Sequence, residues 1–258
     1  MILSVFASGS TGNCALLSEG DTHLLLDDGI SLRRLRAALA LRGLTPEKLS
    51  GVLITHEHKD HISGLPMLTK HCGVPLFAPR TVANHIRWSA AGVDGYIREI
   101  SPGTPFTAGD FTVTAFPTCH DTDQSVGYRI EGSIPFALCT DTGCVTAGML
   151  SALSGCKAAL IEANHDVDML RSGPYPWYLK QRILSERGHL SNDDSAALCC
   201  SLAEAGLRTL VLGHLSRENN LPSLAEKTVA GALKACGQEV ALHIAPEWGH
   251  LYLELGPC

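Results

Sequence analysis

The chain has 258 residues, of which 45% are hydrophobic and 18% charged, a composition that excludes a disordered or fibrous protein. The 20 Lys and Arg residues against 26 Asp and Glu give a net charge of −6, which argues against a protein that coats nucleic acid through bulk positive charge. No apolar run approaches the roughly 18 residues of a membrane span, and the start of the chain lacks the basic segment of a signal peptide. We therefore expect a cytoplasmic protein with a single domain over residues 1–258.

Strands and helices are expected to alternate irregularly along the chain. Strands are predicted over residues 2–6 and 23–26, on either side of a Gly/Ser-rich turn, and a helix over 31–42, where leucines recur at helical spacing. The short apolar run 51–55 is typical of a strand that is covered on both faces. Further strands are predicted over 111–116, 125–130, 136–139, 158–161, 209–212, 240–244 and 251–255, and helices over about 193–205 and 222–236. This order favours layered sheets flanked by helices.

The ten cysteines form no C-x-x-C pair, and most lie within apolar runs such as 136–139 and 196–200. A disulfide framework is usual in short secreted chains, which this chain does not resemble. We expect the cysteines to be free thiols that pack as small hydrophobic side chains.

The densest group of metal-ligating side chains follows the strand predicted over 51–55. His56, His58, Asp60 and His61 lie within six residues of one another. Buried imidazoles need partners for their ring nitrogens, and a buried carboxylate among them needs a cation. His56 and His58 can grip one ion, while Asp60 and His61 lie further along and can reach a second. Imidazole and carboxylate ligands suit zinc, iron or manganese, and the absence of cysteine from this segment disfavours a closed structural zinc site.

This segment resembles the H-x-H-x-D-H signature of the metallo-β-lactamase fold superfamily. The resemblance implies an α+β fold, a four-layer αββα sandwich, with two divalent metal ions (Zn, Mn or Fe) at one edge. It also implies three further ligands, each after an apolar run: His120, Asp141 and His214. The first ion would be bound by His56, His58, His120 and Asp141, and the second by Asp60, His61, Asp141 and His214. The superfamily's earlier acidic residue matches Asp27, which would orient a ligand histidine.

Three other strings narrow the resemblance. Residues 7–14, 161–166 and 213–220 are similar to the YycJ/WalJ group of the superfamily, which is linked to DNA exonuclease activity. The resemblance implies a binuclear metal-dependent phosphodiesterase, an exonuclease of the 5′–3′ type acting on single-stranded DNA or 5′ ends. Its nucleophile would be a metal-bridging hydroxide, and Asp60 would belong to the catalytic residues.

The nearest related chemistry is that of the β-CASP nucleases, in which an acidic residue supports a histidine that protonates the leaving oxygen. By this resemblance Glu162 matches the acidic residue and His189 the histidine. The β-CASP cassette is missing, because only residues 163–188 separate the two. Residues 172–182 stand in its place, and there we expect Trp177 and Tyr178 to stack bases and Lys180 to contact nucleic acid. The alternative is a lid that packs on the body of the protein.

The tetrapeptide Gly-His-Leu-Ser occurs twice, at 188–191 and 213–216, each time before a predicted helix. A helix N-terminus favours anions, which makes Ser191, Ser216 and Asn219 candidates for phosphate binding. The alternative is that the two serines only cap their helices.

Two other functions remain open from the sequence. The same metal centre could hydrolyse a small ester, thioester or lactone, or the protein could be a non-catalytic metal or redox module. A nuclease requires a phosphate site and shows strong salt dependence, whereas an acyl hydrolase requires an apolar pocket. The sequence indicates no protein partner.

Overall fold

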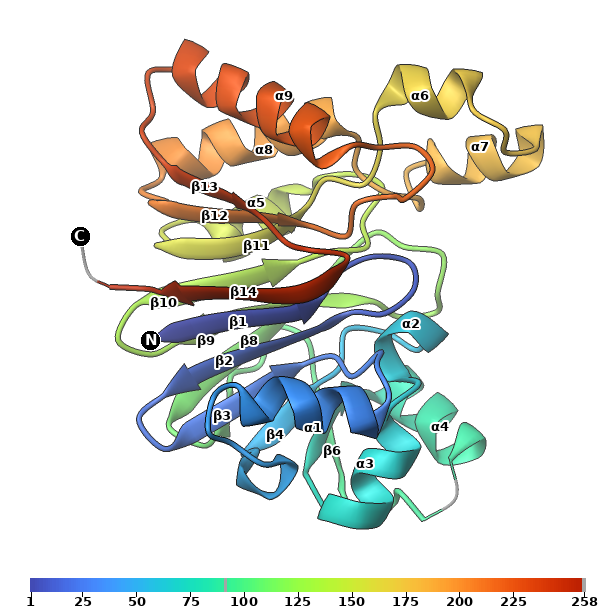
Figure 1. Cartoon of the computed structure of the whole chain (residues 1–258), viewed down its shortest axis with the longest axis vertical. Coiled ribbons are helices and arrows are strands. Elements are labelled where there is room, and N and C mark those ends of the chain that lie inside the picture. The colour runs from blue at the N-terminus through green and yellow to red at the C-terminus, as the bar shows by residue number, and fades with distance from the viewer. Residues whose placement is uncertain (91, 257–258) are drawn as a thin grey trace.

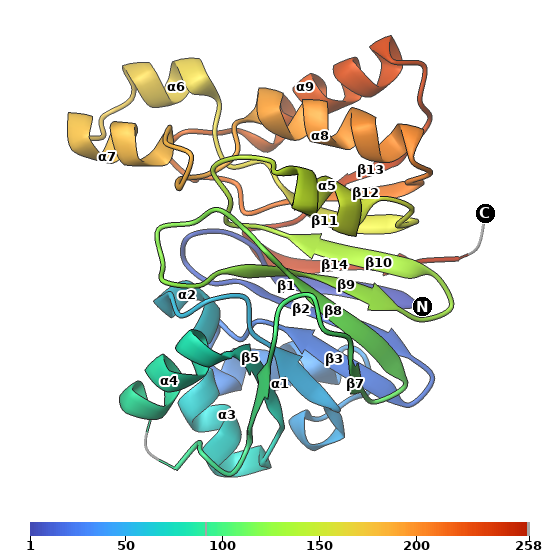
Figure 2. The same cartoon turned by 180° about the vertical axis from the view of Figure 1, so that it is seen from behind.

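The computed structural model describes residues 1–90 and 92–256. Two seven-stranded sheets stack face to face, and helices cover the outer face of each sheet (Figures 1 and 2). The strand order is β14-β1-β2-β3-β4-β5-β6 in the first sheet and β13-β12-β11-β10-β9-β8-β7 in the second. The predicted α+β, four-layer αββα sandwich is confirmed.

The first sheet carries its helical layer on the face turned away from the second sheet. Its strands are β1 (Ile2–Ala7), β2 (Cys14–Glu19), β3 (Thr22–Leu26), β4 (Gly51–Leu53), β5 (Leu76–Pro79), β6 (Ile97–Ile100) and β14 (Trp248–Glu254). The helices are α1 (Leu32–Ala40), α3 (Leu65–Cys72) and α4 (Arg80–Ser89), with the short η1 (Pro46–Lys48) and α2 (Lys59–Ile62) between them. Leu32, Leu35 and Leu39 form the buried face of α1, as their spacing predicts.

The second sheet is covered in the same way. Its strands are β7 (Phe106–Ala108), β8 (Phe111–Pro117), β9 (Val126–Glu131), β10 (Pro135–Cys139), β11 (Ala158–Glu162), β12 (Thr209–Gly213) and β13 (Ala241–Ile244). The covering helices are α5 (Ala147–Leu153), α8 (Asn192–Glu204) and α9 (Pro222–Ala235). Two short helices, α6 (Val167–Ser172) and α7 (Trp177–Ile183), project at the edge of the sandwich (Figure 1).

The space between the sheets is filled by alternate residues of facing strands, as the two-residue period of a strand requires. Leu24 and Leu26 of β3, for example, face the same core as Leu138 of β10. The largest fully buried side chain is Tyr128, whose hydroxyl donates to the carbonyl of Ile54 at 2.6 Å. This bond ties β9 to the segment that leaves β4, directly before the histidine-rich loop.

Several elements differ from those predicted. Residues 14–26 form two strands, β2 and β3, which Gly20 (φ 54°) and Asp21 join in a tight hairpin, whereas only a strand over 23–26 was predicted. The sequence pattern also missed the helices α2 to α7 and the strands β5, β6 and β7.

Nine cysteines within the described residues are free, and Cys14, Cys139, Cys156 and Cys199 are buried as predicted. Cys258 lies outside the described residues. No helix in the described part of the chain is both long enough and apolar enough to cross a membrane.

Candidate metal centre

The predicted metal ligands meet at one edge of the sandwich, where strands of both sheets end. Asp27 follows β3, His56–His61 follow β4, and Asp141 and His214 follow β10 and β12. His120 lies beyond the end of β8. The edge is the one that carries α2 and α7 in Figure 1. Because parallel strands end at the same edge of a sheet, segments far apart in the sequence bring their side chains together here.

Three of these residues have an unusual backbone. Asp27 (φ 56°), Asp141 (φ 56°) and His214 (φ 54°) are the non-glycine residues with positive φ in the described part of the chain. This left-handed conformation is uncommon for residues with a Cβ atom and persists where the surroundings enforce it. Asp27 and His214 directly follow a strand, and Asp141 is separated from β10 only by Thr140, so each turn aims its side chain into the centre.

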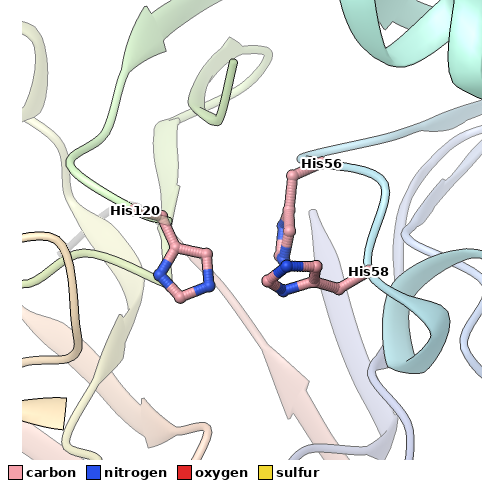
Figure 3. A group of neighbouring side chains, drawn as sticks. All are labelled: His56, His58 and His120. Atoms are coloured by element: carbon pink, nitrogen blue, oxygen red, sulfur yellow. The ribbon is translucent and has the colours of Figure 1, made fainter. Parts of the chain in front are cut away.

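One ligand group consists of His56, His58 and His120 (Figure 3). His56 and His58 come from the loop after β4, and His120 approaches from the opposite side. Each offers one ring nitrogen, and the three nitrogens lie within 4.8 Å of one another. A second group consists of Asp60, His61 and His214, which also offer one ligand atom each within 4.8 Å of one another.

Asp141 lies between the two groups. Its carboxylate oxygens are 3.4 Å from His61 Nε2, 3.5 Å from His214 Nε2 and 3.7 Å from His120 Nε2. Asp60 Oδ2 is likewise 3.4 Å from His61 Nε2 and 3.6 Å from His214 Nε2. Two ligand atoms about 2.1 Å from a tetrahedral zinc ion lie roughly 3.4 Å apart. These separations therefore match atoms that share an ion better than they match short hydrogen bonds.

Several of the ligand atoms are buried without a partner. His56 Nε2, His214 Nε2 and Asp141 Oδ2 have no hydrogen bond within the described structure. Buried polar atoms are normally paired, so three unpaired ligand atoms within this cluster fit a site that binds cations. The donor set of imidazoles and carboxylates fits divalent metal ions.

The opposite ring nitrogens of four ligand histidines are engaged. His56 Nδ1 donates to the Thr55 hydroxyl at 3.0 Å, and His61 Nδ1 donates to Asp27 Oδ2 at 2.8 Å. His120 Nδ1 donates to the Gly188 carbonyl at 3.0 Å, and His214 Nδ1 donates to Glu162 Oε1 at 2.9 Å. These contacts fix the tautomer that leaves Nε2 free for a metal, which is the usual support of a ligand histidine.

The pKa values show an excess of negative charge at the centre. Burial alone would raise the pKa of Asp141, but the surrounding histidines hold it well below its usual range. Burial would lower the pKa of His214, whereas Asp141, Asp60 and Glu162 raise it to about 10. Asp141 and Asp27 likewise raise the pKa of His61 above its ordinary value, against the effect of its burial.

Glu162 anchors two histidines at once. Its Oε1 accepts from His189 Nδ1 at 2.7 Å and from His214 Nδ1 at 2.9 Å, and its Oε2 accepts from the backbone of Thr142 and Leu190. Although burial would raise the pKa of Glu162, the two histidines lower it to about 2. Glu162 is fully buried and ionised, and it links the metal ligand His214 to His189.

A cavity of about 160 Å³ opens beside these residues. Its lining includes His120, His189, His214, Ser10, Asn164, Tyr175, Leu179, Arg182 and Ser216. Arg182 also bonds the carboxylate of Asp121, whose other oxygen is 3.2 Å from His120 Nε2. The α7 helix is thereby tied to the metal centre through a positively charged side chain.

The structure separates the predicted nucleic-acid contacts from the cavity. The side chains of Trp177 and Tyr178 are 72% and 75% exposed and do not line it. Lys180 Nζ donates to the carbonyls of Arg171 and Gly173, which closes the α6–α7 hairpin. From the same segment, Tyr175, Leu179 and Arg182 reach the cavity instead.

The predicted phosphate-binding residues also differ in position. Ser191 caps α8, as its Oγ accepts from the backbone of Asp194 at 3.1 Å. The second Gly-His-Leu-Ser segment does not enter a helix, contrary to the prediction, because residues 217–221 intervene before α9. Ser216 instead accepts from the backbone of Asn219 at 3.2 Å and lines the cavity, while Asn219 is fully buried.

Asn13 joins the centre without having been singled out from the sequence. Its Nδ2 is 3.2 Å from Asp60 Oδ2 and 3.0 Å from His61 Nε2. The available signal was its place in the string 7–14. Arg182 had a similar signal, as part of the aromatic and basic segment 172–182.

The chain is similar to a known protein family and to two named proteins over most of its length. A model of the β-lactamase superfamily domain matches residues 22–215. Exodeoxyribonuclease WalJ of Streptococcus pneumoniae serotype 2 is 39% identical, covering 89% of this chain and 87% of that protein. Exodeoxyribonuclease YycJ of Bacillus anthracis is 36% identical, covering 91% of this chain and 89% of that protein. The chain therefore belongs to the β-lactamase superfamily, in the group that contains these two proteins.

Solved structures agree on the fold. The metallo-β-lactamase fold protein YhfI from Bacillus subtilis superposes with a TM-score of 0.73 at 20% identity, over 98% of this chain and 99% of that one. Zn²⁺-bound PqqB from Methylobacterium extorquens gives a TM-score of 0.70 at 21% identity, over 99% and 100% of the two chains. Family membership and the ligand cluster confirm the prediction of a metal-dependent hydrolase that binds divalent metal ions.

Proposed function

We propose that this chain is a binuclear metal-dependent exonuclease that hydrolyses phosphodiester bonds of DNA from the 5′ end. The observation that carries the proposal is the position of Asp141 between two groups of ligand side chains, beside the Glu162–His189 pair and a small cavity. The names of the two relatives, both exodeoxyribonucleases, support DNA as the substrate.

We assign the ligands as the sequence predicts them. His56, His58 and His120 would hold one ion, Asp60, His61 and His214 would hold the other, and Asp141 would serve both. Asp27 orients His61, and Glu162 orients His214. When bound, the two divalent ions neutralise phosphate charge and bring the pKa of a water molecule towards neutrality.

The chain's own residues then hold the substrate and move a proton. Arg182 and Ser216 line the cavity where a phosphate would lie, and Arg182 is suited to paired hydrogen bonds with phosphate oxygens. His189 has Nδ1 fixed by Glu162, so its Nε2 is the nitrogen available to protonate the departing 3′ oxygen.

The size of the cavity disfavours the alternative of an acyl hydrolase. A pocket for an organic ligand typically has a volume of about 300–1,000 Å³ and a mainly apolar lining. The cavity at this centre is only about 160 Å³, and its lining combines histidines, serines and Arg182 with Tyr175, Leu179 and Ile183. It suits a phosphate group at the end of a polymer that extends outside it.

The direct test is hydrolysis by the purified protein loaded with zinc, manganese or iron. The substrates are one single-stranded DNA labelled at either end, the matching RNA, and a set of thioesters. We expect mononucleotides to be released first from the 5′ end of the DNA. Thioester cleavage without DNA cleavage would overturn the proposal. We further propose that the protein acts in the cytoplasm, where its free cysteines stay reduced.

A further inference from the structure

A surface outside the metal centre combines exposed positive charge with aromatic rings. We call it the α1–β14 face and define it by Arg33, Arg34, Arg42, Trp248 and Tyr252. The segment 29–46 contains four arginines and no acidic residue, in a chain whose net charge is −6. Among the ion pairs of the described residues, none involves Arg33, Arg34 or Arg42. Positive charge is therefore concentrated on this face, with Glu254, which accepts from the Tyr252 hydroxyl at 2.8 Å, as a neighbouring carboxylate.

The arginines lie on aromatic rings in two consecutive pairs. The guanidinium carbon of Arg34 is 3.9 Å from the ring centre of Trp248, and that of Arg42 is 3.9 Å from the ring centre of Tyr252. Trp248 and Tyr252 both lie on β14, and both point to the outer face, where the two arginines cover their rings. The rings hold the guanidinium groups in place, which reduces the entropy lost when they bind an anion.

The face begins at the metal centre. A Cβ atom at Gly12 would lie 3.1 Å from Trp248 Cη2, so the indole packs against the β1–β2 loop. The next residue, Asn13, contacts Asp60 and His61. From there α1 and β14 both run from the edge with α2 towards the opposite edge (Figure 1). The pairs Arg34–Trp248 and Arg42–Tyr252 thus follow one another along a line that leads away from the centre.

We propose that the α1–β14 face binds the single-stranded DNA that extends beyond the nucleotide being removed. This proposal rests on the proposed function. Single strands are bound by grooves that combine positive charge along the backbone with aromatic rings and arginines that stack on bases. An exonuclease must hold the rest of the strand, and this face offers two such units in continuity with the metal centre.

The test compares two double variants that remove the same charge. Arg34→Gln with Arg42→Gln alters the face, and Lys227→Gln with Lys234→Gln is the control on the exposed side of α9, in the other helical layer. Binding is measured with the metal-loaded protein and a fluorescent phosphorothioate strand of about 20 nucleotides, at several salt concentrations. Hydrolysis of a dinucleotide, which is too short to extend along the face, is measured in parallel.

For the arginine variant we expect roughly ten-fold weaker binding near 0.15 M salt and a salt slope reduced by about 1.4, since each phosphate contact on a single strand contributes about 0.7. Dinucleotide hydrolysis should be unchanged, and the lysine control should bind like the wild type. Equal binding by all three proteins would overturn the proposal and leave the proposed function standing.

Other outcomes are equally decisive. A wild-type dimer that the arginine variant converts to a monomer would identify the face as a contact between two copies, against the proposal. The arginine variant could also lose dinucleotide hydrolysis, and the double variant Arg34→Lys with Arg42→Lys is then the second test. This variant keeps both positive charges, so the proposal requires its binding to have the wild-type salt dependence. The wild-type protein could also bind the strand through the arginines and cleave neither DNA substrate. This result would contradict the proposed exonuclease function and would support the α1–β14 face as a DNA-binding surface.

Discussion

Two regions meet at the edge of the sandwich, and they are built very differently. The ligand histidines sit at strand ends, and four of them have Nδ1 fixed by a carboxylate, a hydroxyl or a carbonyl. The segment 164–190, which carries α6 and α7, leaves Trp177 and Tyr178 largely exposed beside the cavity. A rigid centre determines which bond can be hydrolysed, whereas an exposed segment determines which polymer can reach it. Substitutions in the metal centre should therefore abolish hydrolysis, and substitutions in the segment 164–190 should mainly weaken the binding of DNA.

The largest effect is expected at the point shared by both ligand groups. Replacing Asp141 with alanine removes the carboxylate closest to His61, His120 and His214 at once. It leaves several imidazoles around an empty position, so we expect the loss or scrambling of both ions and the loss of activity. Elemental analysis of the purified variant measures this directly. Two retained ions per chain would show that Asp141 does not bridge them.

His189 is the next test, because it lies at the boundary of the two regions. General-acid assistance typically contributes about 10²–10⁴ in rate, so His189→Ala should lower kcat on DNA by about that factor with both ions still bound. A nitrophenyl phosphodiester, whose leaving group needs no proton, should be cleaved almost normally by the variant.

Two results would contradict this role. Loss of a metal from the His189→Ala variant would make His189 a ligand, which its position within 4.8 Å of the other donor atoms permits. A normal rate on DNA would leave it as a structural residue. Both measurements use the same preparation, so a folding defect would be visible in the nitrophenyl reaction.

A buried histidine anchors the exposed segment to the core. His165 is buried with no partner for either ring nitrogen, and burial lowers its pKa to about 4 from an ordinary 6.5. The folded state favours the neutral form of His165, because the pKa is lower in the folded chain than in the unfolded chain. The stability that this difference gives is complete above pH 6.5 and is lost as the pH falls towards 4. The difference is about 3 kcal/mol of unfolding free energy. Denaturant titrations at pH 7 and pH 4 measure how far the unfolding free energy falls between the two pH values. For His165→Met we expect this fall to be about 3 kcal/mol smaller than for the wild type. Equal losses would show that His165 is not buried neutral.

The two regions also differ in how far the sequence alone predicts them. The density of His56–His61 is a local pattern in the sequence, whereas His120, Asp141 and His214 are predicted through the resemblance to the metallo-β-lactamase fold superfamily. The contact of Arg182 with Asp121 joins residues 61 positions apart through the docking of α7, and no local pattern encodes it. At Ser216 the sequence predicts a feature that is not there. The repeated tetrapeptide indicates the start of a second helix, whereas the chain forms a turn in which Ser216 accepts from the backbone of Asn219. Strand β2 was not predicted, because it is short and lies between the Gly/Ser-rich segment and the tight turn at Gly20.

The smallest effect is expected at the exposed aromatic residues of α7. If Trp177 and Tyr178 stack bases, replacing both with alanine should weaken the binding of single strands by about 1–3 kcal/mol for each base lost. Their exposure of 72% and 75% means that little packing is lost with them, so the melting temperature should stay near that of the wild type. Trp88, which is 85% exposed on α4, provides the matched control, and Trp88→Ala should leave binding unchanged. Unchanged affinity together with a lowered melting temperature would instead show that α7 is a lid that packs on the body. The exposed segment would then contribute to DNA binding only through the residues that line the cavity.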